Sequence, residues 1–297
     1  MISTLTRSAT TWRGLPAVQL SSDRLSAVVS MTGAQLACLR RPGETLNPLW
    51  QPPWAAAEHP LLNVIVGSNP CIDRFGSPWP GERKPQHGEA GLLSWESSQE
   101  GEIACFRTCL PLARLAVERQ FSFVGDTLVL TTGVRSLDQV PHPIEWCEHT
   151  TLGDPFLDGA TVTAGIGTPQ PMPGEAPGPA SAAAVLAMPA SAATPRGDIY
   201  SAPVVDGWYR VRAHGRELSV TWDPADFPWL CLWTQHGTRL EAPWLGRTRA
   251  RGMELSTKPF PEGRPPHERA QTWLGRPTTC LVPAHGWLRK TIRMRWA

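Results

Sequence analysis

Leu115-Ala-Val-Glu-Arg-Gln-Phe-Ser-Phe123 and Thr127-Leu-Val-Leu-Thr-Thr-Gly-Val134 are two runs rich in apolar, β-branched and aromatic residues, joined by Val124-Gly-Asp126. Runs of this length and composition favour β-strands, and a short connection that contains glycine favours a tight turn. This part of the sequence therefore predicts a β-hairpin.

Similar short runs recur along the chain. They are Leu25–Met31, Glu102–Leu110, Leu218–Trp222, Trp229–Trp233 and the alternating C-terminal run Gly286–Trp296. The 31 prolines and 26 glycines are spread between them. Long helices are not expected, because an interior proline removes a backbone hydrogen bond and clashes with the preceding turn. Many short strands without intervening helices predict an all-β, antiparallel sandwich, with residues 1–297 as a single domain.

Residues 165–203 differ from the rest of the chain in composition. This stretch is rich in Pro, Ala, Gly and Ser and has few aromatic or β-branched residues. It has little apolar surface to offset the entropy lost on ordering. We expect a Pro/Ala-rich loop or partly ordered insertion within the single domain.

The charge, the apolar runs and the cysteines of the sequence each argue against a class of protein. The net charge of +2, from 28 basic and 26 acidic residues, gives no electrostatic reason to expect nucleic acid or an anionic membrane as a partner. The first twenty residues lack the apolar run of a secretion signal, and no apolar stretch is long enough for a membrane-spanning helix. Seven cysteines without a CxxC pair favour free thiols, so we expect a cytoplasmic protein.

Six segments, in order along the chain, resemble segments of aldose 1-epimerases, which belong to the galactose-mutarotase-like superfamily. The resemblance covers most of the chain and implies an antiparallel β-supersandwich with few short helices. The segments are Leu25–Leu39, Pro48–Trp50, Cys71–Gly76, His87–Gly91, Glu148–Gly153 and Gly252–Thr257.

The same resemblance implies roles for individual residues. Glu254 matches the general base and His149 the general acid, while Arg74 and His87 match positions that bind the sugar. Asp206, in Val205-Asp-Gly-Trp208, is a loose counterpart of a further substrate-binding position. The chain departs from the family after His149, where Thr-Thr-Leu-Gly-Asp-Pro replaces an aromatic, asparagine-containing stretch.

A carboxylate and an imidazole are sufficient for interconverting the two anomers of a free sugar. The base removes the proton of the C1 hydroxyl while the acid protonates the ring oxygen; the ring opens, the C1–C2 bond rotates and the steps reverse. Ordinary pKa values of about 4.3 for Glu and about 6.5 for His suit these roles. The reaction requires no cofactor and no covalent intermediate.

Alternation along the two candidate strands supports the assignment. In a strand over 247–255, Glu254 shares a face with Ala250 and Gly252, which leaves room for a ligand, whereas the arginines lie on the other face. The alternative is a surface glutamate paired with one of these arginines. His149 shares a polar row with Glu145, Cys147 and Thr151.

His149 also fits two roles outside catalysis. The ring suits a histidine packed in the core and bonded to a backbone carbonyl equally well. Cys147 and His149 also resemble half of a metal site, but no second pair has ligand spacing, so we expect no metal.

The remaining candidates are contacts to the sugar. Arg74 carries a fork of donors for adjacent hydroxyls, but it could equally pair with Asp73 or Glu82. His87 follows proline-rich turns, in a loop that either contacts a ligand or is simply exposed. Fourteen tryptophans are too many for one site, so most pack in the core. The candidates for stacking on a pyranose are Trp50, Trp79 and Trp146.

These observations predict a mutarotase-like isomerase acting on a hexose or modified hexose, as a monomer or weak homodimer. Two alternatives remain: a non-catalytic carbohydrate-binding protein on the same scaffold, and an enzyme of different chemistry on this fold.

Overall fold

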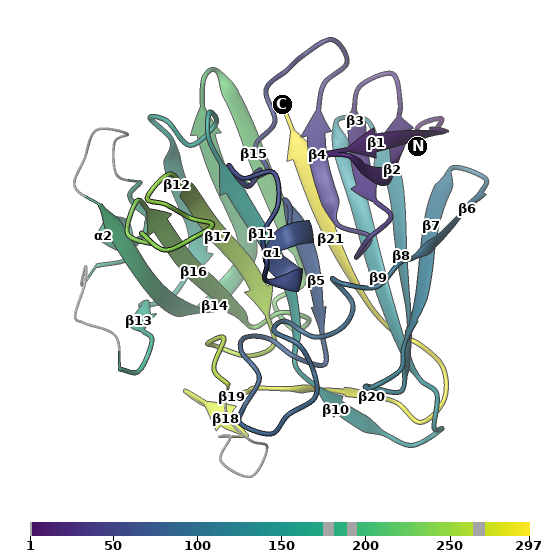
Figure 1. The fold of residues 1–297 in the computed structure, drawn as a ribbon, viewed down its shortest axis with the longest axis vertical. Helices are drawn as coiled ribbons and strands as arrows, with labels where there is room; N and C mark the ends of the chain where they lie inside the picture. The colour runs from purple at the N-terminus through teal and green to yellow at the C-terminus, as the bar shows by residue number, and fades with distance from the viewer. Residues whose placement is uncertain (1, 175–180, 189–194, 264–270) are drawn as a thin grey trace.

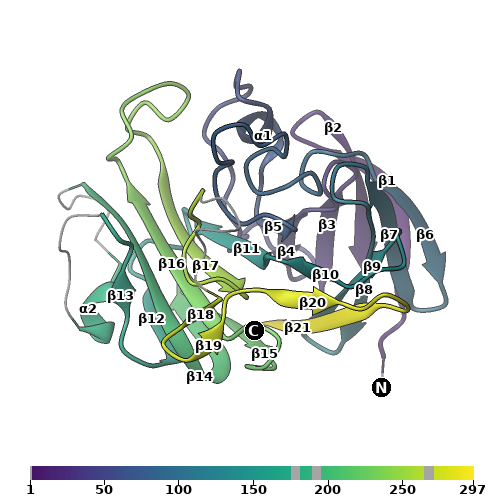
Figure 2. The same ribbon diagram turned by 90° about the horizontal axis from the view of Figure 1, so that it is seen from below.

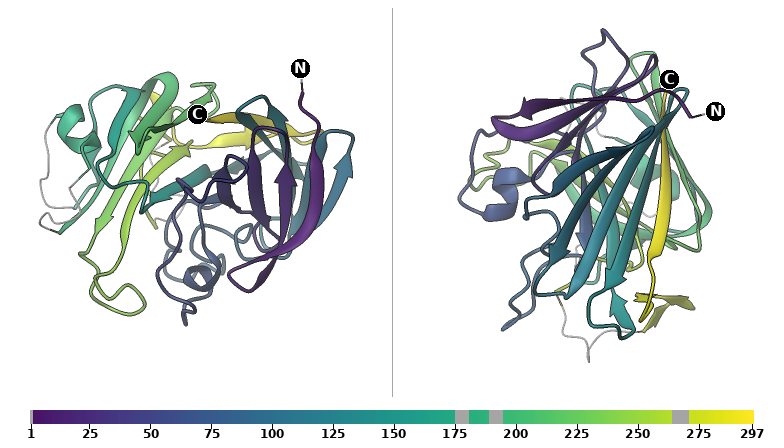
Figure 3. Two further views of the ribbon diagram at one scale, coloured as in Figure 1. Left: turned by 90° about the horizontal axis from the view of Figure 1, so that it is seen from above. Right: turned by 90° about the vertical axis from the view of Figure 1, so that its right-hand side faces the viewer.

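The computed structural model describes residues 2–174, 181–188, 195–263 and 271–297. Within these ranges, 17 strands form one continuous hydrogen-bonded sheet that folds over on itself into two layers (Figures 1 and 3). Neighbouring strands pair antiparallel throughout. The predicted all-β, antiparallel fold is therefore confirmed.

The first layer carries the candidate site. Its strands, in spatial order, are β13 (Gln170–Pro171), β14 (Arg196–Ala213), β16 (Trp229–His236), β17 (Arg249–Ser256), β11 (Trp146–Gly153), β5 (Ser68–Ile72), β4 (Leu36–Arg40), β3 (Ser26–Ser30), β2 (Leu15–Ser21) and β1 (Thr6–Trp12). The central strands β11 and β17 are buried along their whole length.

The second layer packs against the first. Its strands, in spatial order, are β12 (Thr161–Ile166), β14, β15 (Arg216–Trp222), β21 (Leu288–Trp296), β9 (Thr127–Ser136), β8 (Leu115–Val124), β7 (Ile103–Leu110) and β6 (Glu96–Glu100). The long strand β14 belongs to both layers: its first half pairs with β16 and its second half with β15 and β12.

The remaining elements are small. They are the strand pair β10 (His142–Ile144) and β20 (Cys280–Val282), the pair β18 (Thr272–Trp273) and β19 (Arg276–Pro277), and the helices α1 (Pro60–Val64) and α2 (Ala182–Leu186). These are the two helices of the described ranges, and neither is long and apolar enough to cross a membrane.

The hairpin predicted over residues 115–134 is present as β8 and β9. Val124 pairs with Thr127 across the turn, and Gly125 adopts a left-handed φ of +59°, which glycine tolerates without strain. Phe121 and Leu130 face each other across the pair and are buried in the core between the layers. Burial of such side chains stabilises the sandwich by about 1.5–3 kcal/mol each.

The described residues between 165 and 203 are more ordered than the composition of this stretch predicts. Residues 175–180 and 189–194 lie outside the described residues, but 196–203 form the first half of β14. Tyr200 on this half and Val185 and Leu186 of α2 are buried in the main core. The insertion expected over residues 165–203 is therefore too long, because several of its few apolar residues pack in the core between the layers. That the whole chain forms one domain stays a prediction.

Candidate functional site

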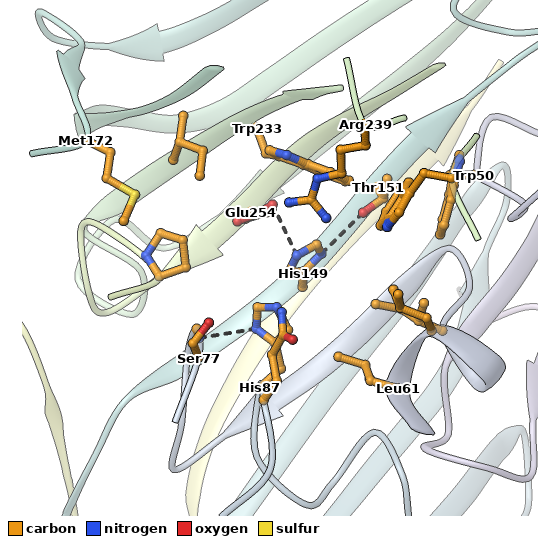
Figure 4. A pocket seen from close by; sticks show the side chains of 17 residues that line it. Trp50, Leu61, Ser77, His87, His149, Thr151, Met172, Trp233, Arg239 and Glu254 are labelled. Carbon is orange, nitrogen blue, oxygen red and sulfur yellow. Dashed lines mark hydrogen bonds and ion pairs between the residues drawn. The ribbon is translucent and has the colours of Figure 1, made fainter. Parts of the chain in front are cut away.

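A cleft of about 230 Å³ lies on the outer face of the first layer, over β11, β17 and β16. Loops from distant parts of the sequence form its walls: the segment around α1, the segment from Gly76 to His87, and the loop between β16 and β17. Figure 2 shows α1 and the β16–β17 loop projecting to the same side of the sheet. The close-up in Figure 4 shows the side chains that converge on this space.

His149 and Glu254 meet on the floor of the cleft (Figure 4). They are direct partners in the pairing of β11 with β17, so their side chains leave the same face of the sheet. Nε2 of His149 lies 3.2 Å from Oε1 of Glu254, and both side chains are buried. Burial raises the pKa of Glu254, and the charge of His149 opposes this rise. The carboxylate is thus a stronger base than it would be in water.

Gly252 makes room for the carboxylate of Glu254 itself, whereas the alternation along β17 predicted that it leaves room for a ligand. A Cβ on Gly252 would lie 2.3 Å from Oε1 of Glu254 and 3.0 Å from Cβ of Trp233. A larger residue here would displace the carboxylate. The alternative of a surface glutamate paired with an arginine is wrong, since Glu254 is only 2% exposed and its ion-pair partner is His149.

His87 reaches the cleft from its loop and lies beside His149, with ring centroids 5.0 Å apart. Its Nδ1 accepts a hydrogen bond from the backbone N–H of Gly76, 3.2 Å away. Burial, and secondarily the charge of His149, lowers the pKa of His87 well below its ordinary value. The neutral ring therefore carries its proton on Nε2, where it serves as a hydrogen-bond donor. The alternative of an exposed loop histidine is wrong, because the residue is buried.

Trp50 lines the cleft as part of a cluster of indoles. Its ring lies 5.7 Å from that of Trp54, edge to face, and 6.2 Å from that of Trp244, stacked. Trp244 also contacts Trp233, with centroids 6.1 Å apart. Trp233 and Trp244 were not among the predicted sugar contacts, although both belong to the excess of tryptophans in the sequence.

Arg239 is a further cleft residue that was not predicted from the sequence. It projects from the β16–β17 loop into the cleft, with its guanidinium 4.7 Å from the ring centroid of Trp244 and 5.6 Å from that of Trp233. Within the described ranges, no hydrogen bond or ion pair to this guanidinium is found. Its five N–H groups can donate hydrogen bonds to a ligand. In the sequence, this role was indicated only by the position of Arg239 near tryptophans, in a loop between two expected strands.

Arg74 and Trp79 lie beside the cleft but do not line it. The Arg74 guanidinium forms an ion pair with Glu82 and stacks 4.1 Å from the ring centroid of Trp79. Arg74 is fully buried. Of the two roles that the sequence left open for Arg74, the structure shows pairing with Glu82. Arg74 thus fixes the loop that carries His87, and the geometry gives no support for its contact with a sugar.

Trp146 and Asp206 do not line the cleft. Trp146 lies three residues before His149, so it points to the opposite face of β11, where it packs against Phe227 at 6.2 Å. Asp206 is exposed on β14. Neither placement supports a contact with the sugar. Among the described residues, no three His, Cys, Asp or Glu side chains lie close enough together to hold a metal ion.

No family model and no curated protein sequence matches this chain. Solved structures do match, with low sequence identity over nearly the whole length. A candidate mutarotase from Salmonella typhimurium has a TM-score of 0.71 and 14% identity over 100% of this chain and 96% of its own. A candidate aldose 1-epimerase from Escherichia coli K12 has a TM-score of 0.67 and 12% identity over 99% of both chains.

A galactose mutarotase-like protein from Clostridium acetobutylicum has a TM-score of 0.66 and 10% identity over 100% of this chain and 99% of its own. The chain has the galactose-mutarotase-like fold. At these identities the likeness extends to the fold alone, so the function is inferred from the chemistry of the cleft.

Proposed function

We propose that this protein is an aldose 1-epimerase-like isomerase that interconverts the α and β anomers of a hexose. The observation that carries the proposal is the pairing of Glu254 with His149, 3.2 Å apart on the floor of a cleft. One group is a carboxylate with a raised pKa and the other is an imidazole. Together they supply the base and the acid that ring opening requires.

The reaction needs two proton transfers in each direction. Glu254 accepts the proton of the C1 hydroxyl while His149 donates a proton from Nε2 to the ring oxygen, and the C1–O bond to the ring oxygen breaks. Rotation about C1–C2 presents the other face of the aldehyde. His149 then takes back its proton, the ring oxygen attacks C1, and Glu254 returns a proton to the new hydroxyl. No atom is gained or lost.

The surrounding side chains suit a sugar. The Nε2–H of neutral His87 and the guanidinium of Arg239 are donors for hydroxyl groups. Trp50 and Trp244 are buried and stacked on each other, so they supply the cleft with an apolar wall of the kind that packs against the C–H groups of a pyranose. We propose these four residues, in place of Arg74, Asp206, Trp79 and Trp146, as the substrate contacts.

The second candidate is a carbohydrate-binding protein without turnover. The observation that favours it is the wall of indoles, which serves binding and takes no part in proton transfer. The departure from the aldose 1-epimerase pattern after His149 points the same way.

Exchange between anomers, measured by NMR across a panel of free aldoses, separates the two candidates. We expect the protein to increase the exchange rate for at least one hexose, and His149→Asn to abolish the increase. Binding by calorimetry without exchange would instead support the carbohydrate-binding protein.

We also propose a setting for this activity. The seven cysteines, all of which the structure describes, are free, which supports a reducing compartment such as the cytoplasm. We propose a small-molecule sugar as the partner, no cofactor, and a monomer or weak homodimer as the working form.

A further inference from the structure

The two ring nitrogens of His149 have different neighbours. Nε2 lies 3.2 Å from Oε1 of Glu254, whereas Nδ1 lies 3.2 Å from the hydroxyl Oγ1 of Thr151 (Figure 4). The ring of His87 approaches edge to face. Within the described part of the chain, Thr151 is thus the hydrogen-bonding partner of Nδ1.

We propose that Thr151 is a positioning residue whose hydroxyl oxygen accepts a hydrogen bond from Nδ1–H of His149 and thereby keeps Nε2 as the nitrogen that exchanges protons. The inference rests on the proposed function, in which His149 is the acid.

The proton balance of the reaction requires such a partner. After His149 has given the Nε2 proton to the ring oxygen, the neutral ring must take a proton back at Nε2. Only the tautomer that carries its remaining proton on Nδ1 has a free lone pair on Nε2. An acceptor beside Nδ1 stabilises this tautomer and also the imidazolium, so one hydrogen bond serves both protonation states.

Local structure holds the hydroxyl in place. Thr151 and His149 are two residues apart on the same face of β11. The backbone of Thr151 is fixed on both sides, since its N–H donates to the carbonyl of Gly67 at 2.9 Å and its carbonyl accepts from the N–H of Trp50 at 2.8 Å. A β-branched side chain on a fixed strand has few rotamers, so the hydroxyl needs little further ordering.

The first test is kinetic. Thr151→Val keeps the shape and strand preference of the side chain but removes the acceptor. A hydrogen bond to a charged ring is worth about 10- to 100-fold in equilibrium or rate, so we expect kcat to fall by that factor with little change in KM. Thr151→Ser restores the hydroxyl and should recover most of the rate.

Thr150→Val is the matched control. It removes a hydroxyl from the same strand, but on the core face, where Thr150 lies 2.8 Å from Ser68. This variant can lose stability, but its kcat should equal that of the parent protein. Equal losses of kcat in Thr150→Val and Thr151→Val would overturn the proposal, because they would indicate a general effect on the strand.

The second test does not depend on activity. In protein labelled with ¹⁵N at histidine, Glu254→Gln replaces the carboxylate beside Nε2 by an uncharged amide and so mimics the carboxyl group after it has accepted the C1 proton. The neutral ring of His149 in this variant, assigned by comparison with His149→Asn, should show a protonated Nδ1 and a bare Nε2. Adding Thr151→Val should move the proton to Nε2. A ring protonated on Nε2 in Glu254→Gln alone would refute the inference. If this variant shows the expected tautomer but the parent protein exchanges no anomers, the proposed function fails and the role of Thr151 toward His149 stands.

Discussion

Arg119 on β8 and Glu148 on β11 form a fully buried ion pair that joins the two layers of the sandwich. The guanidinium donates hydrogen bonds of 2.8 and 3.0 Å to the two carboxylate oxygens. Ser68 on β5 donates a further hydrogen bond of 2.6 Å to the same carboxylate. Glu148 immediately precedes His149 and points to the opposite face, so this pair anchors the strand beneath the cleft.

Breaking this ion pair should be costly. Glu148→Gln leaves the Arg119 guanidinium buried without a counter-charge, so we expect the free energy of unfolding to fall by about 3–5 kcal/mol. Denaturant unfolding provides the measurement. The double variant Arg119→Met with Glu148→Leu removes both charges and should recover much of this loss. A single variant as stable as the parent would contradict the assigned role.

Loss of the base should slow anomer exchange without affecting the fold. Glu254→Gln keeps the size and hydrogen-bonding groups of the side chain but cannot accept the proton. We expect a fall of about 10²–10⁴-fold in rate, the usual contribution of one general acid or base. His149→Asn should cost a similar factor, and the double variant less than the product of the two, because the residues act as a unit. Wild-type exchange in Glu254→Gln would refute the assignment.

Glu254→Gln should also change how the free energy of unfolding depends on pH. Because burial raises the folded-state pKa of Glu254 above its ordinary value, the native protein holds this proton more tightly than the unfolded chain. The stability from this group is present below the ordinary value and is lost as pH rises through the raised one. Glu254→Gln abolishes this loss. Its stability relative to the parent should therefore increase from acidic to neutral pH, as measured by urea unfolding; a difference independent of pH would exclude this effect.

Arg239 should contribute to binding more than to turnover. Arg239→Ala removes a cation for which the described residues supply no ion-pair partner, so we expect KM to rise by about 10-fold or more, with kcat largely kept. Thermal stability should change little, because the residue is exposed in a loop. Arg293→Ala, an exposed arginine on β21, is the matched control and should leave both constants unchanged. Unchanged KM in Arg239→Ala would remove this residue from the site.

Tyr200 tests the corrected extent of the Pro/Ala-rich segment. It is 3% exposed and belongs to the main core, so Tyr200→Ala should lower the free energy of unfolding by about 3–5 kcal/mol, as for other large aromatic residues. Val205→Ala on the same strand changes a residue that is 62% exposed and should cost less than about 0.5 kcal/mol. Equal effects would mean that this half of β14 contributes nothing to the core.

Much of the fold could be predicted because strand formation is encoded locally. The run from Leu115 to Val134 contains its own turn, and the alternation at the C-terminus reappears in β21, where Ile292, Met294 and Trp296 are buried. The fold prediction failed where a low content of apolar residues was interpreted as a lack of ordered structure. Residues 196–203 lie in a segment of low apolar content, yet β16 and the core order them through contacts that are distant in sequence.

The sequence by itself determined strands such as β8, β9 and β21, the alternation of side chains between the two faces of a strand, and the identity of a candidate acid and base. Residues such as Gly252 and Glu254 share a face wherever their strand is placed, because alternation is a property of the extended backbone. The tertiary structure decided which strands are neighbours, and so brought His149 opposite Glu254. It also placed Arg239 and Trp244 in the cleft and buried Arg74 beside it. Burial and proximity set the pKa of Glu254 and His87, and both depend on long-range packing that no local pattern records.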